Sequence, residues 1–304
     1  MLLYIHIPFC DSKCHYCSFN SYVDKFSLRE RYMKALAKQL HYELERFGTA
    51  PKMIETMFIG GGTPSTVMPH LYAPLFEAVK PYLKDDAEVT SEANPNSATK
   101  EWLEGMKKLG VNRISFGVQS FDDRKLKRLG RAHNSHDARR ALWHAKEAGL
   151  KHLSLDLIYG VENDTVKLLE HDLEEAFFLP VDHLSAYALT IEEDTPFASH
   201  PEVANEKLEL TKWLFENIAH RGFKQYEISN FGTYRSLHNM GYWQYKNYIG
   251  LGSGAVGFKD DRRFYPDMHI ESYIDNPLNI QTEILSKKAI KTEKIFLGLR
   301  HILL

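Results

Sequence analysis

The residues best suited to chemistry are the three cysteines Cys10, Cys14 and Cys17, which stand in the pattern C-x3-C-x2-C. They are the only cysteines among the 304 residues. Thiolates are soft ligands that bind iron–sulfur clusters, and such clusters usually take four of them. A short loop can bring three sulfurs to three corners of one cubane at little loop-closure cost. One iron would then keep an open coordination position, where a metal centre can do chemistry.

The same loop is compatible with three simpler arrangements. A disulfide with one leftover thiol is disfavoured, because the number is odd and nothing marks the chain as secreted. A Cys3His zinc site with His15 as the fourth ligand stays open as an alternative, and it would make the loop purely structural. Three unrelated thiols gathered by chance are less favoured than either. The cluster is the preferred interpretation.

The elements that must position this loop alternate along the chain between short β-type runs and helix-type stretches. Such alternation predicts an α/β fold with parallel strands and helices outside, although periodicity alone does not separate an open sheet from a barrel. In both architectures the loops that leave the carboxyl ends of the strands face one mouth. The predicted strands are 2–7, 54–59, 88–93, 113–117, 153–158 and 183–189, and the predicted helices are 27–47, 71–83, 99–109, 135–148, 165–178 and 203–220.

Several candidate binding residues stand at or near the ends of these strands. Consecutive glycines permit a tight turn and a close approach of backbone to a ligand. Asp156 lies in the apolar run Leu-Ser-Leu-Asp-Leu-Ile, and a buried carboxylate needs a partner or a ligand. A guanidinium fork suits a carboxylate, and a carboxylate accepts hydrogen bonds from hydroxyl or ammonium groups. The candidates are Gly61, Gly62, Thr63, Glu92, Gln119, Arg131 and Asp156.

Composition limits the classes of function. Hydrophobic residues make up 43 % and charged residues 26 % of the chain, which is ordinary for a soluble globular protein. A net charge of −2 gives no electrostatic case for nucleic acid, and the basic stretch 124–140 is interleaved with acids like a solvated helix face. We find neither an apolar run of membrane-spanning length nor a signal peptide. The expected location is the reduced cytoplasm.

The segment Tyr4-Ile5-His6-Ile7-Pro8-Phe9-Cys10 and the cysteine pattern resemble the start of radical S-adenosylmethionine (SAM) proteins of the oxygen-independent coproporphyrinogen oxidase family. The resemblance implies a [4Fe–4S] cluster on the three cysteines, with SAM chelating the fourth iron and yielding a 5′-deoxyadenosyl radical on reduction. It implies that the candidates above bind SAM, together with Tyr4 and an apolar pair, Ala188 and Val256.

The resemblance also implies the architecture. Residues 1–224 are expected to form a partial (β/α)6 barrel of the TIM type, and residues 225–304, rich in aromatics and glycines, an accessory C-terminal segment. Members of the family usually continue further into a small helical domain. The sequence is therefore expected either to be a shortened version or to have an unusual end, and both alternatives leave closure of the barrel open.

Two features point to one branch of the family. Phe19 stands where the decarboxylating oxidase has a further cysteine, and His238–Trp243 reads H-N-x-x-Y-W. Both resemble the HemW-type haem chaperones. Imidazole is a usual axial ligand of haem iron, and aromatic rings offer the macrocycle an apolar face. His238 is thus the candidate haem ligand, with Tyr242 and Trp243 packing beside it, and the alternative is a core histidine satisfied by hydrogen bonds.

Two functions follow from the resemblance. The first is a chaperone that binds haem and delivers it to haem-accepting respiratory proteins, with an electron donor supplying the cluster. The second is an oxygen-independent coproporphyrinogen III oxidase, which converts propionates to vinyl groups in porphyrin biosynthesis. Whether the protein is an enzyme stays open at this point.

Overall fold

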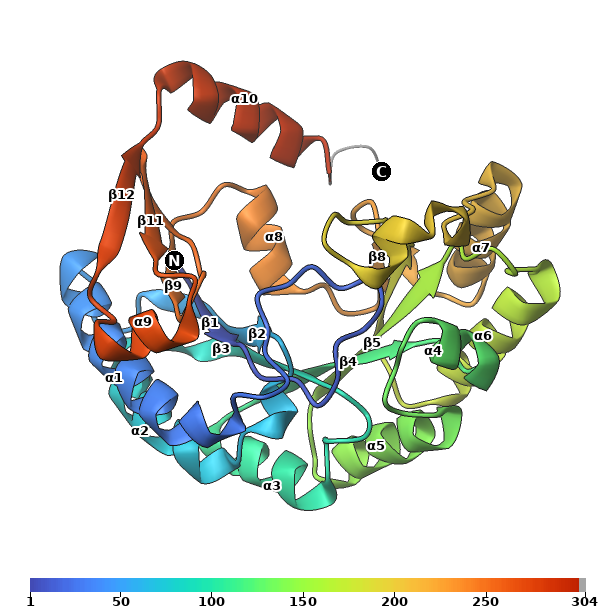
Figure 1. Cartoon of the computed structure of the whole chain (residues 1–304), viewed down its shortest axis with the longest axis horizontal. Coiled ribbons are helices and arrows are strands. Elements are labelled where there is room, and N and C mark those ends of the chain that lie inside the picture. Colours follow the sequence, from blue (N-terminus) through green and yellow to red (C-terminus); the bar gives the residue numbers. More distant parts are fainter. Residues whose placement is uncertain (301–304) are drawn as a thin grey trace.

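The computed structural model describes residues 1–300, and its centre is a run of parallel strands that follow one another in sequence order. This parallel pairing confirms the predicted α/β fold (Figure 1). Residues 301–304, the end of the predicted accessory segment, lie outside the described residues. The central strands are β1 (Leu2–Ile7), β2 (Ile54–Gly61), β3 (Leu83–Ala93), β4 (Arg113–Gln119), β5 (His152–Tyr159) and β6 (His183–Ala188).

Helices connect these strands and cover the outer side of the curved sheet (Figure 1). Among residues 1–300, none has both the length and the apolar character needed to cross a membrane. These connecting helices are α1 (Arg29–Arg46), α2 (Pro69–Val79), α3 (Lys100–Leu109), α4 (Asp123–Arg128), α5 (Ser135–Glu147), α6 (Val166–Phe178) and α7 (Leu208–His220).

The predicted start of the first helix is wrong in one detail. Ser27 and Glu30 have capping-box spacing, but Ser27 lies in a short 3-10 helix, Phe26–Leu28, and α1 begins at Arg29 without a side-chain cap. A capping box does form at α5, where the side chains of Asn134 and Asp137 each accept the other's backbone N–H.

The rest of the chain extends both edges of the central sheet. β8 pairs antiparallel with β6, whereas β9 pairs parallel with β1. β12 and β7 are therefore the two edge strands of the sheet. They do not pair with each other, so no pairing among residues 1–300 closes the barrel. Since pairing continues across residue 224, the division into two domains there stays a prediction. The added elements are β7 (Lys224–Gln225), β8 (Asn230–Gly232), α8 (Leu237–Trp243), β9 (Tyr248–Leu251), β10 (Gly257–Lys259), β11 (Arg262–Pro266), α9 (Ile270–Asp275), β12 (Ile280–Ile284) and α10 (Lys287–Gly298).

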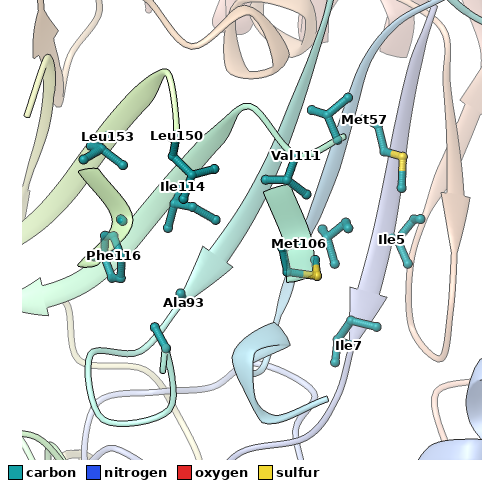
Figure 2. Packing of buried hydrophobic residues seen from close by; sticks show 14 of the residues in the cluster. Ile5, Ile7, Met57, Ala93, Met106, Val111, Ile114, Phe116, Leu150 and Leu153 are labelled. Carbon is teal, nitrogen blue, oxygen red and sulfur yellow. The ribbon is translucent and has the colours of Figure 1, made fainter. Parts of the chain in front are cut away.

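Side chains alternate between the two faces of the central strands, as the two-residue period of a strand requires. The outward face carries the main hydrophobic core, which includes Ile5 of β1, Met57 of β2, Ile114 of β4 and Met106 of α3 (Figure 2). The inward face is polar instead. Buried polar groups need hydrogen-bond partners, which are either other side chains of the barrel interior or a bound ligand. Its members include Tyr4, Glu92, Arg113, Ser115, Asp156, His183, Ser185 and Tyr187.

Candidate functional site

A cavity of about 500 Å³ lies at the carboxyl ends of the central strands. This volume falls in the range usual for small-molecule sites, roughly 300–1,000 Å³. Most of the residues predicted from the sequence line it, although they come from several different strands and their loops. Those brought together are Cys10, Cys14, Cys17, Gly61, Gly62, Thr63, Glu92, Gln119, Arg131, Asp156 and Ala188.

The cysteine loop leaves the end of β1 and folds over this cavity. Its three thiols are free, and backbone bonds from Cys10 N to Tyr22 O (3.0 Å) and from Cys17 N to Cys14 O (3.2 Å) hold its shape. Burial raises the pKa of the Cys10 and Cys17 thiols. Metal binding at this loop must therefore displace protons, which makes assembly depend on pH.

A chain of hydrogen bonds links two of the sulfurs to the strand ends. The Arg131 guanidinium donates to Cys14 Sγ (3.2 Å) and to Asn94 Oδ1 (2.7 Å). The Asn94 amide donates to Thr63 Oγ1 (3.2 Å), whose hydroxyl donates to Cys10 Sγ (3.3 Å). Hydrogen bonds to sulfur tune the potential of a cluster, so Arg131 and Thr63 suit the support of a metal group.

The zinc alternative does not fit this geometry. His15, its fourth ligand, is hydrogen-bonded through Nδ1 to the carbonyl oxygen of Arg128 (2.9 Å), and its ring packs on Phe197. Over residues 1–300, no three His, Cys, Asp or Glu groups converge on a single-ion site. The donor chemistry, three thiols on a cavity of ligand size, fits a larger sulfur-bridged cluster with room for a bound molecule beside it.

Backbone conformation and close packing require glycine at positions 61 and 62. Gly61 has φ +107°, a conformation that favours glycine, and a Cβ on Gly62 would lie 2.8 Å from the carbonyl oxygen of Ile7. The N–H groups of Gly61 and Gly62 already donate to Glu92 Oε2 and Ile7 O. A ligand amino group donates hydrogen bonds, so it would bind to the backbone carbonyl oxygens of this tract rather than to its N–H groups.

Two carboxyl groups, Glu92 and Asp156, face the cavity from the barrel wall. Burial, with the nearby charge of Asp156, raises the pKa of Glu92 to about 8. Burial also raises the pKa of Asp156, opposed by Ser185 and Arg113. A raised pKa in a cleft is typical of a functional site, and these acids are placed to accept ribose or amine donors.

The raised pKa of Glu92 gives a pH-dependent prediction. The folded state holds this proton more tightly than the unfolded chain, whose Glu pKa is about 4.3. The resulting stability is complete below about pH 4 and is lost as pH rises through a folded-state pKa of about 8. We expect the free energy of unfolding of the cofactor-free chain, measured with urea, to fall between about pH 5.5 and 8.5 by more in the parent than in Glu92→Gln. Parallel pH profiles for the two proteins would contradict the prediction.

Gln119 reaches the cavity through a local distortion of β4. It has φ +70°, uncommon for a residue with a side chain, and the register of β4 against β5 shifts between Phe116 and Gln119. Backbone strain of this kind costs about 1–3 kcal/mol and often marks a functional position. Alternation from Arg113 and Ser115 already assigns Gln119 to the inward face, and the irregularity ends the strand so that the amide lies at the mouth.

Tyr4 and Val256 are not brought to this cavity. Tyr4 lines a second chamber of about 200 Å³, which is deeper in the barrel and shares Glu92, Ser115, Asp156 and Tyr187 with the first. Val256 is half-buried in the turn before β10, where its carbonyl oxygen would meet a Cβ on Gly250. The predicted SAM contact of Val256 is therefore unsupported by its position.

The haem role predicted for His238 does not fit its place in the structure. His238 is 1 % exposed, and its Nδ1 and Nε2 are hydrogen-bonded to Thr56 Oγ1 (2.7 Å) and Tyr242 OH (3.0 Å). Burial and Arg113 lower its pKa to about 3. The smaller chamber, at about 200 Å³, lies below the usual range of ligand sites and cannot hold a macrocycle. The geometry is that of a satisfied core histidine.

Trp243 lies apart from the other aromatic candidate of its motif. Neither cavity includes it, and its indole ring instead faces the Arg300 guanidinium, 4.2 Å from the ring centroid. The guanidinium also pairs with Glu227, a fully buried carboxylate, at 3.2 Å. Trp243 thus contacts Arg300, two residues after the end of α10, and Tyr242 is hydrogen-bonded to His238.

Several wall residues were not predicted from the sequence, Arg113 foremost. They lie at alternate positions of otherwise apolar strands, as in Arg-Ile-Ser-Phe of β4 and His-Leu-Ser-Ala-Tyr of β6. This alternation predicts one polar face, and it is the signal that could have found them. The missed residues are Arg113, Ser115, His183, Ser185 and Tyr187.

The barrel with a three-cysteine mouth defines the class of protein. Residues 4–176 match the model of the radical SAM superfamily. Among solved structures, the chain is similar to coproporphyrinogen III oxidase (HemN) of Escherichia coli, described as a radical SAM enzyme. The TM-score is 0.83 over 99 % of this chain and 75 % of that one. At 20 % sequence identity this likeness shows the fold alone.

Relatives identify the branch more narrowly. The chain is 35 % identical to the haem chaperone HemW of Bacillus subtilis, over 98 % of its own length and 82 % of the relative. It is 40 % identical to HemW of Escherichia coli, over 86 % and 71 % of the two lengths. The chain belongs to the HemW family of haem chaperones within the radical SAM superfamily.

Proposed function

We propose that this protein is a cytoplasmic haem chaperone that carries a [4Fe–4S] cluster and SAM, binds haem and delivers it to haem-accepting proteins. The observation that carries the proposal is the presence of three thiols, with no further cysteine in the chain, on one ligand-sized cavity. The identity to HemW relatives supports the haem part. The proposal includes a separate electron donor that reduces the cluster.

Each wall residue has a role in this proposal. Cys10, Cys14 and Cys17 would hold the cluster, which together with SAM supplies reductive radical chemistry when both are bound. Thr63 and Arg131 direct hydrogen bonds at the sulfurs and fix the loop.

The remaining wall residues would bind SAM. Carbonyl oxygens of the glycine tract and Glu92 suit its amino group, because both accept hydrogen bonds. Asp156 suits hydroxyl donors of the ribose, and Ala188 offers an apolar contact.

The competing function is that of the oxidase, and one assay separates the two. The reconstituted, reduced protein is incubated anaerobically with SAM and coproporphyrinogen III, and haem is titrated in parallel by its absorbance. We expect stoichiometric haem binding without multiple-turnover formation of protoporphyrinogen. Sustained protoporphyrinogen formation would contradict the chaperone proposal and support the oxidase.

A further inference from the structure

The smaller chamber of the barrel contains a buried cation without a partner. Arg113, the first residue of β4, is 2 % exposed and lines this chamber of about 200 Å³. Within residues 1–300 its guanidinium forms no hydrogen bond or ion pair, and its Nε atom is buried and unsatisfied. A buried, unpaired guanidinium is costly, since such charges are normally paired.

The charges around Arg113 do not neutralise it fully. Glu92, with its pKa at about 8, is mainly protonated at neutral pH. Asp156 is the other acid of the chamber wall, but Ser185 and the second cation Arg131 also act on it. His183 and His238 are neutral, because burial and Arg113 lower their pKa values. Of the two acids that line the chamber, Asp156 is therefore left to balance both arginines. The buried Glu88 lies on the same face of β3 as Glu92, but it already accepts hydrogen bonds from Tyr234 OH and from the N–H groups of Leu237 and His238.

Neutral donors complete the lining. Asn239 of α8 faces the chamber, and its side-chain amide has no hydrogen-bond partner among residues 1–300. Hydroxyl groups of Ser115 and Ser185 also line the chamber. A cation surrounded by neutral donors is the arrangement that binds an anion, and the flat fork of arginine matches a carboxylate in particular.

We propose that this chamber is a binding site for a small carboxylate, held by the Arg113 fork with help from Asn239. The volume equals that of about six or seven water molecules, at roughly 30 Å³ each, which limits the ligand to the size of a short carboxylic acid. The carboxylate could be free or could be the propionate arm of a tetrapyrrole. The site does not depend on the proposed haem function.

The test uses the full chain after anaerobic reconstitution with iron and sulfide. Its thermal unfolding midpoint is followed as sodium propionate replaces sodium chloride at constant ionic strength. In the parent the midpoint rises and saturates, because a ligand of the folded state stabilises it. In Arg113→Gln the apparent dissociation constant rises about tenfold or more. Arg140→Gln, which removes an exposed arginine, serves as the matched control and behaves like the parent.

Two results would overturn the site: no propionate-dependent rise in the parent, or the same rise in the parent and Arg113→Gln. If Arg113→Gln does not fold, Arg113→Lys and Asn239→Leu replace it. Lysine keeps the charge without the fork, and leucine keeps the size without the amide. Both are expected to weaken propionate binding, and unchanged binding in both would overturn the proposal.

A haem titration with and without propionate separates the two sources of the carboxylate. Weaker haem binding in the presence of propionate, in the parent but not in Arg113→Gln, shows that a haem propionate uses the site. Unaffected haem binding, with the propionate-dependent rise retained, shows a free carboxylate. Absence of haem binding with the rise retained would contradict the proposed function and leave the carboxylate site supported.

Discussion

Replacing Cys14 with alanine is expected to abolish cluster assembly. After anaerobic reconstitution the parent should hold about four irons and four sulfides per chain, and Cys14→Ala should hold almost none. The reason is that the chain has three cysteines, so the variant leaves two thiolates for a group that needs at least three. Iron and acid-labile sulfide analysis measures the difference, together with the loss of visible absorbance.

The control for this experiment lies in the same loop. Ser18 is exposed and directly follows Cys17, so Ser18→Ala should load iron and sulfide like the parent. Equal loading of Cys14→Ala and the parent would contradict the assignment of the thiols. Stoichiometric zinc without sulfide in the parent would instead restore the zinc alternative.

Replacing Lys125 with methionine is expected to destabilise the fold strongly. Lys125 is buried and pairs with Asp164 at 2.7 Å, with Asp172 at 4.0 Å. Removing one partner leaves buried carboxylates unpaired, which costs about 3–5 kcal/mol in the free energy of unfolding. Asp172 also accepts hydrogen bonds from Ser120 Oγ and Phe121 N, so the same cluster anchors the segment that leads to Arg131.

Urea unfolding of the cofactor-free chain measures this effect. Lys127→Met is the matched control, because Lys127 lies on the same helix and is exposed, and we expect a change within about 0.5 kcal/mol. An equally small loss in Lys125→Met would show that the pair is not needed for stability.

The parts of the fold that could be predicted from sequence are those encoded locally. β1 and the cysteine loop follow each other directly, so an apolar run and three thiols are enough to predict a metal site at a strand end. The acids predicted at strand ends, Glu92 and Asp156, reach the cavity because alternation within a strand sets the face of each side chain.

The parts that could not be predicted depend on contacts between distant residues. His238 lies in α8, whose first N–H groups donate to Glu88, 150 positions earlier, at 3.0 Å for His238 N. This contact orients His238 toward the barrel interior, where its Nδ1 is hydrogen-bonded to Thr56 Oγ1. Nothing in H-N-x-x-Y-W shows which way the helix faces, so the motif indicates a haem ligand where the fold needs a core residue.

Arg113 illustrates the opposite error. It begins a short apolar strand, and arginine at a strand end is usually exposed. Its alternation with Ser115 could have placed it on the polar face of the strand, but not beside α8. The curvature of the sheet brings β4 and α8 to one chamber, so the surroundings of this charge become visible only in three dimensions.

The proposed cluster, held by three thiols with its remaining iron bound to SAM in the mouth cavity, has one direct spectroscopic test. Electron–nuclear double resonance is recorded on the reduced, reconstituted protein with SAM labelled with ¹⁵N at its amino group. We expect a ¹⁵N hyperfine coupling that appears only when labelled SAM is present. A cluster signal without that coupling, at SAM concentrations that equilibrium dialysis shows to be saturating, would contradict the coordination of SAM by the cluster.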